Sequence, residues 1–337
     1  MMKKEKTIPK VNVIITTYNN AHTLPYCLES ALTQTFQDYK ILVVDNGSTD
    51  NTTEVVSKYS VGYFRQENKG LTAGLNKGIE LTQGQYIAFL DSDDILVANA
   101  LEKRVEVLDK HPEVGFCYGQ IHLMDESGNI YGLRKSTFLN ESAIVDGKEQ
   151  IKELLFTNRI TLSTVMVRRR CFDESVGKLD ERFKYFGDDL LMFIKLAKAY
   201  PVAYISEPLA KYRRRSGFGR IYVKDAERAW FLALQEVFDT PELQAYFRPW
   251  REKAYFNAYK SAAGYVYGYG RDIKLTRHYL RKAIKIYPRS LLQREALPAA
   301  YLYARALIPN RLSLMLRNLK ARFRGSSRNN SRERENA

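Results

Sequence analysis

The chain has 337 residues, 45% of them hydrophobic, which is enough to bury a substantial core in one large or two unequal domains. It carries 53 Lys and Arg against 38 Asp and Glu, and this net charge of +15 favours polyanionic partners: nucleic acid, an anionic membrane surface or phosphorylated substrates. Its cysteines, Cys27, Cys117 and Cys171, lie far apart, and its four histidines are scattered. This arrangement argues against a zinc site and favours a reducing compartment.

Two kinds of targeting signal are missing from the sequence. Residues 1–10 are polar and basic, without the apolar run of a secretory signal. No stretch approaches the roughly 20 apolar residues of a membrane-spanning helix. The sequence therefore predicts a cytoplasmic protein whose first ten residues form a polar tail.

Strands and helices alternate, with short connections, over the first 110 residues. Strands are predicted at 11–17, 40–44, 61–65 and 86–90, and helices at 24–32, 51–59, 69–81 and 97–110. This alternation predicts an α/β fold with a parallel sheet and right-handed crossovers.

The strand predicted at 86–90 runs directly into Asp91-Ser92-Asp93-Asp94. In open α/β sheets, ligands bind at the carboxyl ends of the strands. Asp91 and Asp93 are two residues apart, so in extended chain both project from one face. Carboxylate oxygens suit Mg²⁺ or Mn²⁺. The triplet predicts a metal site, although an acidic triplet by itself is also typical of a solvated turn.

Polar residues also follow the first two predicted strands, as Tyr18-Asn19 and Asp45-Asn46-Gly47-Ser48. If these strands are neighbours of the strand at 86–90, the three turns converge on one edge of the sheet and favour a nucleotide-and-metal site. No Gly-x-Gly-x-x-Gly and no Gly-x-x-x-x-Gly-Lys-Ser/Thr is present, which disfavours a dinucleotide site and a phosphate-binding loop.

Five motifs, in this order and at these separations, resemble those of the family 2 glycosyltransferases. They are Val-Ile-Ile-Thr-Thr-Tyr-Asn at 13–19, Val-Val-Asp-Asn-Gly-Ser-Thr-Asp at 43–50, Asn-Lys-Gly at 68–70 with Ala-Gly-Leu-Asn-Lys-Gly at 73–78, Ile-Ala-Phe-Leu-Asp-Ser-Asp-Asp at 87–94, and Gly-Asp-Asp-Leu at 187–190. The resemblance covers roughly residues 10 to 215. It implies the GT-A fold, a Rossmann-like, mostly parallel sheet flanked by helices, and an inverting enzyme that uses nucleotide-diphosphate sugars.

The resemblance also implies a nucleotide-sugar site on this chain. Its residues would be Thr17, Tyr18, Asn19, Asp45, Ser48, Gly70, Ala73, Asn76, Asp91, Ser92, Asp93, Arg213 and Arg215. Within this set, Asp45 is expected to accept the imide N–H of a uracil-type base, because a carboxylate is a strong charge-assisted acceptor. Asp93 is expected to ligate the divalent metal, and Asp91 to contact the ribose or the metal's water.

For two groups of residues in this set, the residue type itself suggests a role. Gly70, Ala73 and Asn76 are expected where the backbone passes close to the nucleotide, which would explain small residues there. Arg213 and Arg215 belong to a Tyr-Arg-Arg-Arg stretch where the family commonly has Tyr-Arg-x-His. Arg215 stands in the place of that His, which favours a phosphate contact over a metal contact.

The catalytic base is expected in the Gly-Asp-Asp-Leu motif. Acidic residues in the first turn of a helix also stabilise it through the helix dipole, which is the alternative interpretation of this pair. Inverting transfer needs a base that takes the proton of the acceptor hydroxyl. The resemblance assigns this role to Asp189 and a supporting role to Asp188, where the family usually shows Glu. Arg159, Ser163 and Thr164 are weaker candidates that would border the acceptor, or else belong to a sheet edge.

The composition changes after residue 222, where helices are predicted at 224–238, 242–268, 272–287 and 291–307. Between 297 and 324, basic residues alternate with large apolar ones, which favours a helix lying on an anionic membrane or, alternatively, on the protein's own core. Residues 325–337 are polar and predicted to be disordered. The predicted domains are a catalytic domain at 11–222, a helical region at 223–324 and a terminal tail.

The leading hypothesis is a metal-dependent inverting glycosyltransferase of the hexosyltransferase type. It would move a sugar from a UDP or dTDP donor to a hydroxyl of a glycan or lipid-linked acceptor, peripherally at the cytosolic membrane face, in surface polysaccharide synthesis. A nucleotidyltransferase of similar fold is one alternative, but no Gly-rich, basic triphosphate loop follows the first strand. A basic nucleic-acid-binding protein is the other, and no nucleic-acid motif supports it, so no nucleic-acid partner is expected.

Overall fold

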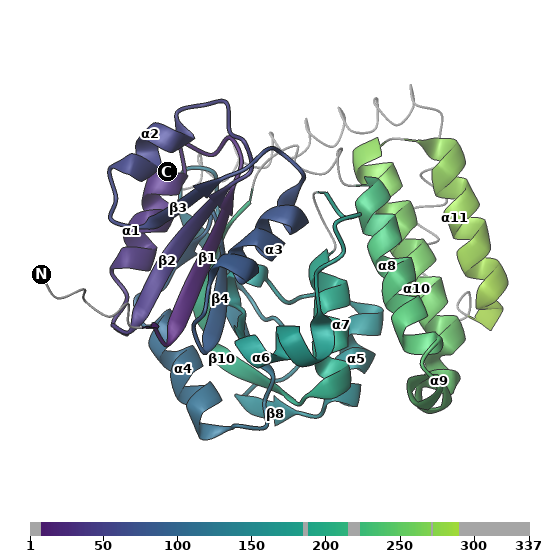
Figure 1. Cartoon of the computed structure of the whole chain (residues 1–337). Coiled ribbons are helices and arrows are strands. Elements are labelled where there is room, and N and C mark those ends of the chain that lie inside the picture. Colours follow the sequence, from purple (N-terminus) through teal and green to yellow (C-terminus); the bar gives the residue numbers. More distant parts are fainter. Residues whose placement is uncertain (1–7, 185–187, 215–222, 271, 290–337) are drawn as a thin grey trace, which may run out of the picture. The chain divides into compact units, whose positions relative to one another are not determined.

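A computed structural model describes residues 8–184, 188–214, 223–270 and 272–289 (Figure 1). By compactness the chain divides into two units, residues 1–254 and 255–337. The predictions for Arg215, for the helix at 291–307, for the membrane stretch at 297–324 and for the terminal tail fall outside the described residues.

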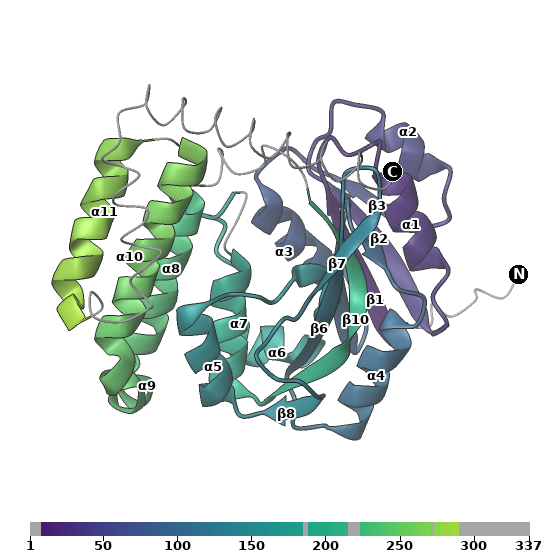
Figure 2. The same ribbon diagram turned by 180° about the vertical axis from the view of Figure 1, so that it is seen from behind.

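A mixed sheet forms the centre of the first unit. Its strands in the described residues are β1 Val11–Thr17, β2 Tyr39–Asp45, β3 Gly62–Arg65, β4 Tyr86–Asp91, β5 Ile95–Leu96, β6 Phe116–Met124, β7 Ile130–Arg134, β8 Ala143–Val145, β9 Met166–Arg168 and β10 Val202–Arg213. Their order is β3-β2-β1-β4-β9-β6-β10-β5. Strand β7 pairs with β6, as Figure 2 shows, and β8 pairs with β10.

The described residues also form helices. They are α1 Leu24–Leu32, α2 Thr52–Ser57, α3 Leu71–Leu81, α4 Ala100–Lys110, α5 Gly147–Phe156, α6 Arg169–Cys171, α7 Asp188–Ala199, α8 Val223–Phe238, α9 Pro241–Phe247, α10 Arg251–Tyr265 and α11 Ile273–Ile286. Short 3₁₀ or π turns lie at Leu162–Thr164, Phe172–Val176, Arg248–Trp250 and Val266–Gly270.

Helices cover both faces of the sheet. Strands β1 and β4 carry apolar side chains on both faces, and the helices bury them. Alternate residues of β1, Val13 and Ile15, pack in one core with α1 and α4. Ile14 points the other way, where its side chain approaches Gly78 of α3 so closely that a Cβ on that glycine would lie 2.4 Å from it. Helices on both faces of parallel strands are the arrangement that buries continuous apolar strands.

The alternation predicted for the first 110 residues is confirmed. The four strands β3, β2, β1 and β4 are parallel neighbours. Strand β9 is antiparallel to β4, so beyond this point the sheet is mixed. Strand β10 was not predicted, because Ser206-Glu207-Pro208 interrupts its apolar pattern and shifts its register with β6.

The helical region differs from its prediction at two places. The single helix predicted at 242–268 is wrong: α9 and α10 are separated by a 3₁₀ turn at Arg248–Trp250, where Pro249 supplies no N–H. Helix α8 belongs to the first unit, where Ala229 packs with Phe183 and Leu191. The compact units thus divide at residue 254, inside α10, whereas the composition changes near residue 223; the domain limits themselves stay predictions.

The described part of the second unit comprises the end of α10, the turn at Val266–Gly270, and α11. Aromatic pairs join its two helices, with Tyr259 stacked on Tyr279 at 6.3 Å between centroids and Phe256 5.9 Å from Tyr287. None of the described helices is long and apolar enough to cross a membrane.

Candidate active site

The carboxyl ends of β2, β1 and β4 lie side by side. Thr17 is the register partner of Asp45, and Thr16 is the register partner of Asp91. The convergence expected from the sequence is therefore present. In parallel sheets this edge is where ligands bind, and here it brings the turns after the three strands together. These turns are called the site rim below.

Hydrogen bonds join the three turns of the site rim into one unit. The backbone N–H of Asn19 donates to Ser48 Oγ at 2.9 Å, and Asn19 Oδ1 accepts from the N–H of Thr49 at 2.7 Å. Asn20 Nδ2 donates to Ser92 Oγ at 2.7 Å. Asn19 has φ 51°, a left-handed conformation that Asn tolerates better than most residues. The predicted residues Asn19, Ser48 and Ser92 thus hold the rim in shape.

Asp45 lies below the surface of the rim rather than on it. Its side chain is fully buried, and Oδ1 accepts from the N–H of Ser48 at 2.8 Å and from its Oγ at 2.7 Å. Oδ2 accepts from the hydroxyl of Tyr63 at 2.7 Å, and Arg65 Nε lies 3.8 Å away. The carboxylate is therefore covered by the protein, with Tyr63 bonded to one of its oxygens. Tyr18, by contrast, is 45% exposed at the end of β1.

The three aspartates after β4 divide into two kinds. Asp91 and Asp93 are half-buried. Asp94 is 1% exposed, and it accepts from Ser163 Oγ at 2.6 Å and from the N–H of Arg213 at 3.0 Å. Burial, and then the charges of Asp93 and Asp91, raise the pKa of Asp94 well above its ordinary value. Asp94 therefore anchors the turn from inside, which leaves Asp91 and Asp93 as the candidates for ligand contact.

Arg213 lies buried beside the carboxylate turn. It is 6% exposed, and its guanidinium donates to the backbone carbonyls of Asp93 at 3.0 Å and Glu126 at 2.9 Å. Its donors are directed at the protein's own backbone in this structure, and its expected contact with the diphosphate stays a prediction. Its role here is to hold the carboxylate turn against the turn after β6.

The small residues at the start of α3 have a packing role in addition to the predicted one, which stays a prediction. A Cβ on Gly70, which has φ 100°, would lie 2.8 Å from the Cα of Lys184, so that segment requires glycine. Asn76 donates to the carbonyl of Leu179 at 3.0 Å and accepts from its N–H at 2.9 Å. Ala73 is 7% exposed in the same helix. These residues fix the segment around 179–184 to α3.

The segment 158–164 connects the carboxylate turn to the start of α7. Ser163 Oγ accepts from the N–H of Asp91 at 3.1 Å in addition to its bond with Asp94. Asn158 Nδ2 donates to Asp189 Oδ2 at 3.3 Å. Five residues span at most about 17 Å even when fully extended. The segment therefore limits how far Asp189 can lie from the carboxylate turn. The side chain of Asp188 lies outside the described residues.

Two residues near the carboxylates escaped prediction. Burial, and then the charge of Asp94, raise the pKa of the Tyr212 hydroxyl, so this ring lies beside the carboxylate turn. The guanidinium of Arg134 lies 5.5 Å from the centre of that ring and donates to Thr161 Oγ1. Burial lowers the pKa of Arg134. Tyr212 is the first residue of the Tyr-Arg-Arg-Arg stretch, whereas nothing in the sequence around Arg134 distinguishes it from other arginines.

The oxygen donors of the rim fit a hard divalent cation in part. Asp91 and Asp93 offer carboxylates, while both oxygens of Asp94 are engaged by Ser163 and Arg213. Among the described residues no group of three His, Cys, Asp or Glu is arranged as a complete metal site. A cation held by Asp91 and Asp93 would complete its coordination with water and substrate phosphates, as Mg²⁺ commonly does.

The family model described as "Glycosyl transferase family 2" matches residues 12–177. The glycosyltransferase GlyG of Streptococcus pneumoniae is 31% identical over 241 residues, which are 68% of this chain and 78% of GlyG. The chain spans about a third of the length of several uncharacterised Rickettsia glycosyltransferases at 28–29% identity, 33% in the case of the Rickettsia felis protein.

Solved structures share the fold at low sequence identity. TarS of S. aureus, in complex with UDP-GlcNAc, has a TM-score of 0.56 at 19% identity, over 82% of this chain and 89% of that one. The mannosyltransferase PcManGT of Pyrobaculum calidifontis, in complex with GDP-Man and Mn²⁺, has a TM-score of 0.50 at 16% identity, over 90% and 88%. The GT-A-like arrangement expected from the sequence is confirmed by this shared fold.

Proposed function

The chain belongs to glycosyltransferase family 2, and we propose that it is an inverting enzyme that transfers a sugar from a nucleotide diphosphate to a hydroxyl. One observation carries the proposal. Asp91 and Asp93 project from the carboxyl end of a central parallel strand, and the segment 158–164 links this turn to Asp189. This connection supports the proposal that a metal-and-phosphate site and a general base act on the same substrate.

The donor is proposed to be a nucleotide-diphosphate sugar with a UDP or dTDP carrier. TarS binds UDP-GlcNAc and PcManGT binds GDP-Man, so both structural neighbours take donors of this class. A uracil or thymine imide would donate to Asp45. In this chain the base would compete with the hydroxyl of Tyr63, which donates to Oδ2 of Asp45. Thr17, whose Oγ1 is buried without a partner in the described residues, lies beside it and offers a further hydroxyl.

Asp93, supported by Asp91, is proposed to hold Mg²⁺ or Mn²⁺. The cation would neutralise charge that develops on the departing diphosphate. The contribution of the chain is to fix the two carboxylates, because Arg213 donates to the Asp93 carbonyl and Ser163 accepts from the Asp91 N–H. The Mn²⁺ bound in PcManGT is consistent with such a site.

Asp189 is proposed as the base that removes the proton of the acceptor hydroxyl. Its Oδ1 accepts from the N–H of Leu190 at 2.7 Å, and its Oδ2 lies 3.3 Å from Asn158 Nδ2. These contacts orient the carboxylate in the first turn of α7. The acceptor is proposed to be a glycan or lipid-linked hydroxyl in surface polysaccharide synthesis, with Asp188 in a supporting role.

The test is release of nucleotide diphosphate from a panel of UDP-, dTDP- and GDP-sugars, with Mg²⁺, with Mn²⁺ and with chelator. We expect metal-dependent turnover of one donor. Asp189→Asn should bind the nucleotide like wild type by calorimetry while its turnover falls at least about 100-fold, because only proton removal is lost. Absence of both turnover and nucleotide binding across the panel would contradict the proposal.

A further inference from the structure

Helix α11 has two opposite faces of contrasting chemistry. The residues on its buried face are Thr276, Tyr279, Leu280 and Ala283. Tyr279 stacks on Tyr259 of α10, so this face is the one that packs within the second unit. At about 100° per residue, the four buried positions share one side of the helix.

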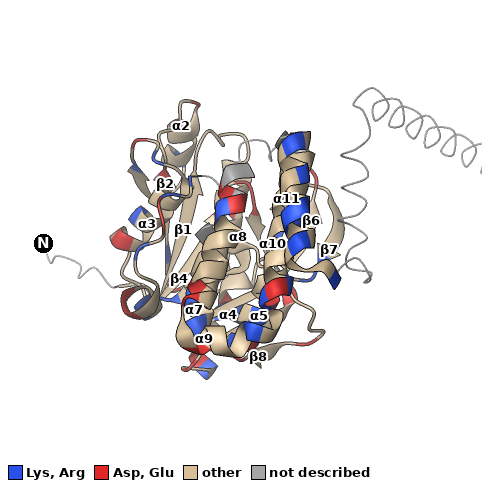
Figure 3. Ribbon diagram, turned by 90° about the vertical axis from the view of Figure 1, so that its right-hand side faces the viewer, with Lys and Arg blue, Asp and Glu red and all other residues tan. Residues whose placement is uncertain are grey.

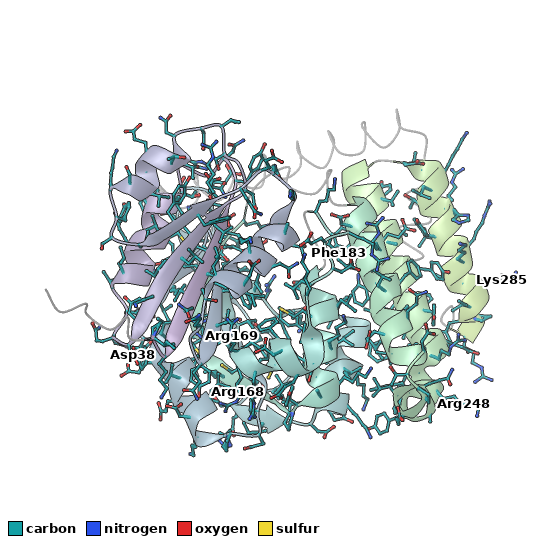
Figure 4. The ribbon with its side chains drawn as sticks, in the orientation of Figure 1. Asp38, Arg168, Arg169, Phe183, Arg248 and Lys285 are labelled. Atoms are coloured by element: carbon teal, nitrogen blue, oxygen red, sulfur yellow. The ribbon has the colours of Figure 1, made fainter. Side chains whose placement is uncertain are left out.

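The other side of α11 is a row of basic side chains, called the basic row below. Its members, all exposed and spaced four, three and four residues apart, are Lys274, His278, Arg281 and Lys285. Figure 3 shows the Lys and Arg colour running along α11, and Figure 4 shows Lys285 on the side away from α10. The row extends over twelve residues, or about 16 Å of helix between its first and last members.

The basic row is unfavourable for the helix that carries it. Arg281 and Lys285 are four residues apart, and like charges at this spacing destabilise a helix. Lys274 lies in the first turn, where the helix dipole disfavours a cation. Helix α11 itself contains no Asp or Glu; the acid nearest in sequence is Asp272, whose carboxylate caps the helix by accepting from the N–H of Leu275 at 2.9 Å.

Nothing within the described second unit compensates this charge. Residues 255–289 contain eight Lys and Arg and one acidic residue, Asp272. Lys274, Arg281 and Lys285 form no ion pair with another residue that the structure describes. The anions that would balance the row are therefore not among the residues that the structure describes.

We propose that the basic row of α11 docks onto the surface of an anionic lipid bilayer. A straight row of cations on one side of a helix contacts a plane of phosphate headgroups along its whole length. Each Lys or Arg held near such a surface strengthens binding about five-fold. The apolar side of α11 is occupied by α10, so the contact is electrostatic and involves no insertion into the acyl region.

The chemistry of the face favours a bilayer over nucleic acid. Binding of single strands combines cations with aromatic rings on which the bases stack. Tyr279, the aromatic residue in the middle of α11, lies 5% exposed on the buried side, and His278 holds the one ring of the row. The proposal does not depend on the donor or the acceptor, because binding is measured without turnover.

The experiment is co-sedimentation of the full chain with vesicles of phosphatidylcholine alone or with about 30% phosphatidylglycerol. The test variant combines Lys274→Gln, Arg281→Gln and Lys285→Gln. Its matched control combines Lys58→Gln, Lys110→Gln and Lys178→Gln, which removes the same charge from exposed positions of the first unit. Circular dichroism checks that both variants fold.

We expect wild type to bind only the anionic vesicles and to be released as salt rises from about 0.1 M to about 1 M, because screening then acts within a few ångströms. The test variant should bind about 100-fold more weakly, while the control stays within about ten-fold of wild type. Equal losses in both variants would assign binding to net charge, and unchanged binding of the test variant would assign it to another segment. Tighter binding to single-stranded nucleic acid than to vesicles at equal salt would overturn the choice of partner.

Discussion

The two ends of the parallel strands use polar side chains in opposite ways. At the amino end, Arg168 and Arg169 lie near the start of β4, and Figure 4 labels them at this end of the sheet together with Asp38. Their guanidiniums donate to backbone carbonyls, including those of His111 at 2.7 Å and Ile79 at 2.9 Å. At this end the arginine side chains hydrogen-bond the protein's own backbone and so stabilise the fold.

At the carboxyl end, the polar groups divide between the fold and the ligand. Asp45, Asp94 and Arg213 are buried and bonded to the protein, while Asp91 and Asp93 remain half-buried on the surface of the rim. Exposure therefore distinguishes the two ends. Arg168 at the amino end is buried, whereas the carboxyl end keeps a pair of half-buried carboxylates.

The largest effect is expected from replacing Arg168, which tests whether the polar groups at the amino end serve stability alone. It is 7% exposed and donates to Val114, His111, Leu108 and the Tyr86 hydroxyl. Arg168→Ala should lower the free energy of unfolding by about 3–4 kcal/mol, because several buried carbonyls lose their donor. Turnover per folded molecule should stay within about two-fold of wild type. Denaturant unfolding and activity at low temperature check both; a larger effect on turnover than on stability would break the comparison.

Asp94 tests whether part of the rim is structural. Asp94→Ala leaves Ser163 Oγ and the Arg213 N–H without their acceptor, and we expect a loss of about 2–3 kcal/mol in the free energy of unfolding. Asp94→Asn should cost less, because it keeps an oxygen acceptor and buries no charge. Chemical denaturation of both variants measures this order. An Asn variant as unstable as the Ala variant would show that the charge itself is needed.

Tyr63 tests whether Asp45 is occupied by the protein or open to a base. Tyr63→Phe removes the 2.7 Å bond to Asp45 Oδ2 and should lower the free energy of unfolding by about 1 kcal/mol. The same loss frees an acceptor, so UDP should bind up to about five-fold more tightly. Calorimetry with UDP measures this. Weaker binding would mean instead that the Tyr63 hydroxyl orients Asp45 for the base.

The smallest change in stability is expected for Asp109, whose carboxylate accepts from the hydroxyl of Tyr86 at the amino end of β4. Burial alone would raise the pKa of its carboxyl, but bonds from Lys10 and Tyr86 outweigh burial and hold the pKa below its ordinary value of 3.8. A lowered folded-state pKa stabilises the fold above 3.8, and this contribution disappears as the pH falls through the folded-state value. Asp109→Asn should be about 0.5 kcal/mol less stable at neutral pH, and equal to wild type in strong acid. Urea unfolding across this pH range measures the difference, and a difference independent of pH would contradict the assignment.

The parts predicted from the sequence are those that depend on local pattern. Short apolar runs predicted β1, β2 and β4, and parallel neighbours bring their carboxyl ends to one edge. Asp91 and Asp45 could be placed at that edge because each directly ends a strand.

The parts that could not be predicted depend on contacts distant in sequence. Arg213 donates to the carbonyl of Asp93, 120 residues earlier, and Asn76 bonds Leu179, 103 residues later. No local pattern specifies such partners, so both residues looked available to a ligand. Arg134, beside Tyr212, is near the carboxylates for the same long-range reason.

The most direct test of the central claim, that the half-buried carboxylates bind the metal and donor, is turnover and thermal stability of Asp93→Ala. With the donor identified from the panel and saturating Mg²⁺ or Mn²⁺, we predict a loss of at least about 100-fold in turnover, because the metal loses a ligand. The melting temperature should change by less than about 2 °C, since this side chain is half-buried. Turnover equal to wild type, or a loss explained entirely by unfolding, would contradict the claim.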